Sequence, residues 1–140
     1  MVEWKIFALS SALFAGLTAL LGKIGVQNIN SNLATFIRTV VVLFLLSFLL
    51  TIRGEWANPL EIDHKSLVFL ILSALATGLS WICYYRALQT GPVSLVVPID
   101  KLSIAFAVLL SVLFLRERPA IYHWLGIFLI ICGTLIIVFK

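Results

Sequence analysis

The sequence has few charged residues, and this scarcity excludes most soluble folds. Aspartate, glutamate, lysine and arginine make up 11% of the 140 residues, whereas soluble domains typically contain about 25%. Hydrophobic residues make up 62%, against about 45–50% in soluble domains. The composition therefore predicts an integral membrane protein, with little room for a soluble domain.

Cysteine and histidine are also scarce, and their placement excludes several kinds of site. Cys83 and Cys132 both fall inside apolar runs, so no disulfide framework is expected. His64 and His123 stand alone near the ends of such runs, without metal-ligand spacing. The sequence shows no basic run typical of nucleic-acid binding, no nucleophile–base pair and no phosphate-binding loop. We therefore predict no metal, no cofactor, no nucleic-acid partner and no enzymatic activity.

Five long apolar runs dominate the chain. Each has about the 20 residues that a helix needs to cross a hydrocarbon core. Backbone polar groups find no partners in lipid, so such runs must form helices. Short polar turns separate the runs, and the longest loop covers residues 53–66. We expect an all-α, multi-pass protein with a single domain over residues 1–140, whose spans cover residues 6–24, 33–52, 67–88, 93–115 and 121–139.

The odd number of spans constrains the topology. Five crossings place the two termini on opposite sides of the membrane. A unit of this kind can pair with an inverted copy of itself, as many secondary transporters do. The distribution of basic residues weakly favours a cytoplasmic N-terminus. Its near balance leaves insertion in both orientations open.

Arg38 is the most informative ionisable residue. It lies about five residues inside the second run, where a basic side chain costs a few kcal/mol unless it is paired or snorkels to the interface. Asp100 and Lys101 lie at the same end of the fourth run. Because adjacent residues of a helix face about 100° apart, we expect Asp100 to pair with Arg38 rather than with Lys101. Snorkelling of Arg38 is the alternative.

Pro98 precedes these charges and predicts an irregular helix. Inside a helix it removes the bond to the Ser94 carbonyl and bends the chain. A broken span beside ionisable groups is typical of transporter sites. The alternative is that the span begins at Pro98, which would make Asp100 an acid at a helix N-terminus.

Polar and aromatic residues on the third run suggest a cavity lining, although close helix packing would also use such small side chains. Gly126 and Gly133 on the fifth run instead indicate a packing or dimer seam. Together with the ionisable residues, the third run gives the predicted substrate-binding set: Lys23, Arg38, Thr77, Ser80, Trp81, Tyr84, Asp100 and Lys101.

Several stretches resemble one EamA domain of the drug/metabolite transporter superfamily. They are residues 12–23, 33–38, 87–95, the Leu-Arg-Glu-Arg ending at 115–118, and residues 126–136. Most such proteins fuse two domains into a ten-helix inverted-repeat fold. The resemblance implies that this chain is half of that fold, as in the five-helix bacterial and archaeal subgroup. The sequence departs from the family at residues 98–101, where the family usually has an uncharged segment.

Together these features predict a secondary transporter in the bacterial or archaeal cytoplasmic membrane. It would move small metabolites by alternating access as a homodimer, with parallel and antiparallel pairing both open. The excess of Lys23, Arg38 and Lys101 over Asp100 points to anionic or zwitterionic substrates, such as organic acids or amino acids. One alternative is a proton-coupled exporter of cationic compounds like the small multidrug resistance proteins, with Asp100 as its carboxylate. Another is a membrane scaffold that transports nothing.

Overall fold

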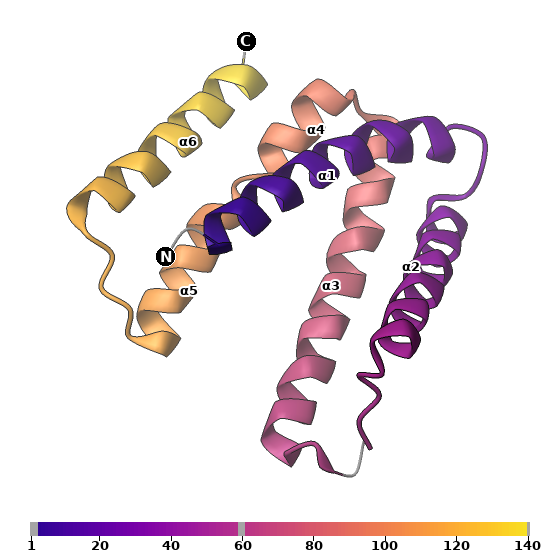
Figure 1. The fold of residues 1–140 in the computed structure, drawn as a ribbon. Coiled ribbons are helices and arrows are strands. Elements are labelled where there is room, and N and C mark those ends of the chain that lie inside the picture. The colour runs from indigo at the N-terminus through magenta and orange to yellow at the C-terminus, as the bar shows by residue number, and fades with distance from the viewer. Residues whose placement is uncertain (1–2, 59–60, 140) are drawn as a thin grey trace. The chain divides into compact units, whose positions relative to one another are not determined.

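The computed structural model describes residues 3–58 and 61–139, and all regular structure in these ranges is helical. Figure 1 shows the helices in chain order. Their bounds are α1 Glu3–Val26, α2 Ser31–Arg53, α3 His64–Thr90, α4 Val93–Asp100, α5 Ser103–Leu115 and α6 Ile121–Phe139.

The predicted spans are confirmed. With α4 and α5 taken together as Val93–Leu115, the described residues contain five helical segments long and apolar enough to cross a membrane. The helices α1, α2 and α3 begin and end one to three residues beyond the predicted spans. Their large apolar side chains are mostly exposed, as lipid-facing surfaces require. The chain is therefore an all-α, multi-pass membrane protein.

The chain divides into two compact units between Thr90 and Gly91. The first contains α1, α2 and α3, and the second contains α4, α5 and α6. The expected single domain over residues 1–140 stays a prediction, and its bounds at residues 1 and 140 lie outside the described residues.

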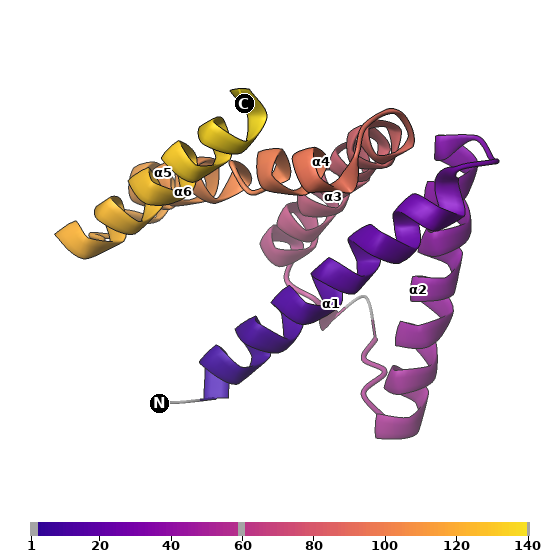
Figure 2. The same ribbon diagram turned by 90° about the horizontal axis from the view of Figure 1, so that it is seen from above.

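In the first unit, α1 and α2 form a hairpin that packs on α3. The two helices diverge from their shared turn in both views (Figures 1 and 2). Asn30 starts α2, because its side-chain oxygen accepts a hydrogen bond from the Asn32 amide at 2.8 Å. The buried residues of this unit gather at the turn end of α1 and α2 and the C-terminal end of α3: Ala19, Val26, Ser31, Thr35, Tyr85 and Leu88.

Lys23 joins α1 to the end of α3. Pro92 lacks a backbone N–H, so the carbonyl of Leu88, four residues earlier, has no helical donor. The Lys23 ammonium donates to that carbonyl at 2.6 Å. A cation at a helix C-terminus also interacts favourably with the helix dipole. Lys23 therefore caps α3 from a neighbouring helix.

Gln89 ties the same helix end to the turn between α1 and α2. Its side-chain amide donates to the carbonyls of Val26 at 3.2 Å and Ile29 at 2.9 Å. Its side-chain oxygen accepts from Arg86 at 3.0 Å. These bonds and the Lys23 cap fix the three helices of the first unit at one end.

In the second unit, α4 and α5 both pack on α6. The predicted break in the fourth span is confirmed: α4 ends at Asp100 and α5 begins at Ser103. Across the break, amides bond three residues back, as Leu102 does to Ile99 at 3.0 Å. Thr134 on α6 donates to the Pro98 carbonyl at 3.4 Å and links α6 to this break. The alternative that the span begins at Pro98 is wrong, because α4 already begins at Val93 and contains that proline.

Replacing Lys23 tests the cap. We expect Lys23→Met to lower the free energy of unfolding by about 1–2 kcal/mol, because the Leu88 carbonyl loses a charged hydrogen-bond donor while the aliphatic stem is kept. Thermal unfolding in detergent measures the change. Lys5→Met, near the start of α1, is the control. Equal midpoints for the two variants would contradict the capping role.

Candidate anion-binding site

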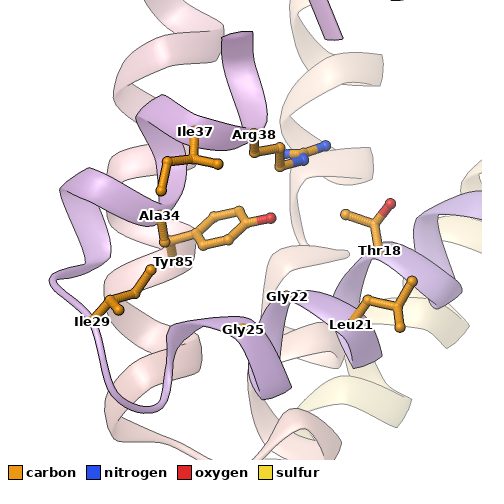
Figure 3. Close-up of a pocket in the computed structure, with 9 residues that line it drawn as sticks. All are labelled: Thr18, Leu21, Gly22, Gly25, Ile29, Ala34, Ile37, Arg38 and Tyr85. Atoms are coloured by element: carbon orange, nitrogen blue, oxygen red, sulfur yellow. The ribbon is translucent and has the colours of Figure 1, made fainter. Parts of the chain in front are cut away.

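A pocket of about 350 Å³ opens between α1, α2 and α3, at the end where the three helices are tied together. Figure 3 shows the side chains that surround it. The lining combines one cation, two hydroxyl groups and a majority of apolar or small residues: Thr18, Leu21, Gly22, Gly25, Ile29, Ala34, Ile37, Arg38 and Tyr85.

Arg38 supplies the positive charge of this pocket. Its guanidinium carbon lies 4.0 Å from the centre of the Trp81 ring and 5.6 Å from the centre of the Tyr85 ring. Each such contact contributes about 0.5–2 kcal/mol, which offsets part of the few kcal/mol that a basic residue costs within a membrane. Arg38 is half-buried, and its contacts with the Trp81 and Tyr85 rings place the guanidinium at the pocket.

Arg38 keeps its hydrogen-bonding capacity for other partners. Among the described residues, no carboxylate lies within ion-pair distance of Arg38, and no protein group accepts a hydrogen bond from it. The contacts with the two rings use the positive charge of the guanidinium and take up no N–H donor. The donors are therefore available to an anion in the pocket.

Helical spacing on α3 builds the aromatic platform. Trp81 and Tyr85 are four residues apart and so share one face of the helix, and this face meets Arg38 from α2. Tyr84 contacts Tyr85 edge to face, with ring centres 6.1 Å apart and planes at 74°. Tyr85 is 4% exposed, and it was not in the predicted substrate-binding set.

Gly22 allows α1 to approach Tyr85. A Cβ atom at this position would lie 3.2 Å from the Tyr85 hydroxyl oxygen, closer than ordinary van der Waals contact. A larger residue would require the tyrosine hydroxyl to give way by a few tenths of an ångström. Gly22 therefore helps to set the position of Tyr85 at the pocket.

The other predicted residues of the first unit lie outside the pocket lining. Thr77 and Ser80 are exposed on α3, and the Thr77 hydroxyl donates to the Ser73 carbonyl at 2.9 Å. The Lys23 ammonium donates a hydrogen bond to the Leu88 carbonyl. Trp81 contacts Arg38 but is likewise outside the lining. The substrate-binding roles expected for all of these residues, and for Arg38 itself, stay predictions.

Asp100 and Lys101 form an ion pair in the second unit, with 3.5 Å between carboxylate and ammonium. The expectation that Asp100 would not pair with Lys101, because adjacent helical residues face about 100° apart, is therefore wrong. The helix ends at Asp100, and the flexible lysine side chain reaches back to the carboxylate. Both side chains are partly exposed, at 36% and 47%. Arg38 lies in the other unit, so its pairing with Asp100 stays a prediction.

The turn between α5 and α6 contains a smaller hollow of about 270 Å³, lined in part by Glu117, Arg118 and His123. The His123 ring nitrogen Nδ1 accepts a hydrogen bond from the Ala120 amide at 3.1 Å, so His123 caps the start of α6. In the part of the chain that the structure describes, no group of three histidine, cysteine or acidic side chains could hold a metal ion.

The family model described as the EamA-like transporter family matches residues 3–139. The chain belongs to this family. A Sinorhizobium protein named "Uncharacterized transporter in cobO 3'region" is 46% identical over 135 residues, which are 96% of each chain. The chain is thus a multi-pass transporter of the cell membrane, which implies a small-molecule substrate.

Two further relatives extend the comparison. A Yersinia pseudotuberculosis protein named as a probable 4-amino-4-deoxy-L-arabinose-phosphoundecaprenol flippase subunit is 31% identical over 105 residues, 68% of this chain and 92% of that protein. The Bacillus subtilis transporter YxxF is 29% identical over 133 residues, 91% of this chain but 40% of that protein. No solved structure was found to match this chain.

A pair of alanine substitutions tests the contact between Gly22 and Tyr85. We expect Gly16→Ala to be neutral or stabilising by up to about 1 kcal/mol, because nothing lies near its Cβ and alanine favours helix. We expect Gly22→Ala to be less stable than Gly16→Ala by about 1–2 kcal/mol, because it crowds the Tyr85 ring. Thermal unfolding in detergent compares the two, and equal stability would refute the close contact.

Proposed function

We propose that the protein is a secondary transporter of small metabolites that carry a negative charge, organic acids or amino acids in particular, and that it is not an enzyme. It would act by alternating access in the cytoplasmic membrane of a bacterium or archaeon. The pocket around Arg38 is the proposed substrate site.

The placement of Arg38 is the observation that carries this proposal. In the second unit, Asp100 and Lys101 neutralise each other. In the pocket of the first unit, the described lining residues include the positively charged Arg38 and no acidic side chain. A substrate anion would supply the missing charge and accept the guanidinium N–H donors, which match carboxylate and phosphate oxygens in two-point geometry. A cationic drug would be repelled there, which disfavours the multidrug-exporter alternative.

A homodimer is the proposed assembly. A unit of five spans corresponds to half of an inverted-repeat transporter. The Yersinia relative is named as a subunit, and the Bacillus relative is long enough to contain a second stretch of this length. The broken span at α4 and α5 also supports alternating access, because discontinuous helices are common at the sites of such transporters.

Uptake by proteoliposomes tests the site. With radiolabelled succinate, glutamate and leucine as probes, we expect Arg38→Ala to reduce uptake of every transported probe at least tenfold. Arg38→Lys should also reduce uptake strongly, because an ammonium group lacks the flat face and the paired donors of guanidinium. Wild-type uptake by Arg38→Ala would overturn the assignment.

Arg53→Ala is the matched control for this experiment. Arg53 ends α2 on the side far from the pocket, where it lies 3.8 Å from Glu55 with most of its side chain exposed. Removing its charge should leave uptake unchanged. Asp100→Asn examines the second unit in the same assay, and reduced uptake is expected there if the ion pair at the broken span takes part in transport.

A further inference from the structure

We infer that Thr18 and Tyr85 complete the receptor that Arg38 begins, with one hydrogen-bond donor from each helix of the first unit. This inference rests on the proposed function and narrows its substrate class. The ligand it describes is a carboxylate or phosphate group attached to a short apolar body, without an ammonium group.

The Thr18 hydroxyl differs from every other threonine hydroxyl in the protein. A threonine in a helix commonly donates to the carbonyl three or four residues earlier. Each of the other threonines donates to a backbone carbonyl, as Thr35 does to Ser31 and Thr134 to Pro98: Thr35, Thr39, Thr51, Thr77, Thr90 and Thr134. Thr18 lines the pocket, and its hydroxyl has no acceptor among the described residues.

The Tyr85 hydroxyl is the second donor without an acceptor. The residue is 96% buried, and a buried tyrosine usually finds a partner for its hydroxyl. Figure 3 shows this hydroxyl pointing into the space between Arg38 and Thr18. Within the described chain no group pairs with it, and Gly22 leaves the room that it occupies. The residue is buried, while its polar end faces the pocket.

The three donors lie at similar distances from the end at which the three helices are tied together. Thr18 lies eight residues before the end of α1, Arg38 seven residues after the start of α2, and Tyr85 five residues before the end of α3. At 1.5 Å per residue these positions are about 8–12 Å from one end of the helices. The pocket that the three helices border is thus lined by one donor group from each of them at a similar level.

The remaining lining selects against a zwitterion. Leu21, Ile29 and Ile37 provide apolar contact for the body of a ligand, and no carboxylate in the described lining could hold an ammonium group. Burying an unpaired ammonium costs several kcal/mol. Of the two substrate classes proposed above, the pocket thus favours organic acids over amino acids.

Calorimetric binding to the purified full chain in detergent tests the donors. The probes are 4-methylpentanoate, L-leucine, which adds an ammonium group to the same carbon skeleton, and isopentyl phosphate. We expect the wild type to bind 4-methylpentanoate or isopentyl phosphate, and to bind leucine at least tenfold more weakly. Whichever oxyanion binds more tightly identifies the head group. The inference is overturned if the wild type binds neither 4-methylpentanoate nor isopentyl phosphate. It is also overturned if leucine binds as tightly as the oxyanion probe.

Near-isosteric variants test each hydroxyl. Thr18→Val and Tyr85→Phe should each weaken binding about tenfold, because each removes one hydrogen bond to a charged group. Two variants serve as controls. Thr39→Val removes a hydroxyl that already donates to the Thr35 carbonyl, and Tyr122→Phe removes a hydroxyl in the second unit. Circular dichroism and gel filtration verify the fold of every variant.

The outcomes separate this inference from the proposed function. If Arg38→Ala abolishes uptake and binding while Thr18→Val and Tyr85→Phe bind like the controls, the three-donor receptor is refuted and the transport proposal stands. If Arg38→Ala has no effect on uptake, the proposed site fails, and the inference fails with it.

Discussion

Hydrocarbon offers no hydrogen-bond partners, and this constraint explains most of the polar contacts in the protein. Threonine hydroxyls return to their own helix, as at Thr35 and Thr39. The Leu88 carbonyl, deprived of a donor by Pro92, receives the Lys23 ammonium. The charges at the broken span neutralise each other. Against this background, the pocket of the first unit stands out, because its lining brings together Arg38 and two hydroxyl groups that pair with no described residue.

Much of the fold was readable from the sequence, because spans follow from the length of apolar runs. The break beside Pro98 was also predictable from the missing amide. The Lys23 cap was missed, although Pro92 four residues after Leu88 was a visible sign of an unpaired carbonyl. Lys23 was instead included in the substrate-binding set on the basis of its charge.

The geometry of the candidate site was predictable only in part. Arg38 and Trp81 were both in the predicted set, but their contact depends on which faces of α2 and α3 meet, and this is a property of packing. Thr18 and Tyr85 were not in the predicted set. A hydroxyl in a helix normally satisfies itself locally, so the sequence alone does not distinguish Thr18 from Thr77. The distinction requires the hydrogen bonds themselves.

The separation of charges between the two units has a consequence for the response to membrane voltage. The Asp100–Lys101 pair has no net charge, so an electric field exerts no net force on the broken span as it moves. Arg38 retains a full positive charge. A charge that crosses the whole field exchanges about 2.3 kcal/mol per 100 mV with it. Any voltage sensitivity from charges within the spans would therefore arise mainly in the first unit, and an anion bound to Arg38 would remove the share that Arg38 contributes.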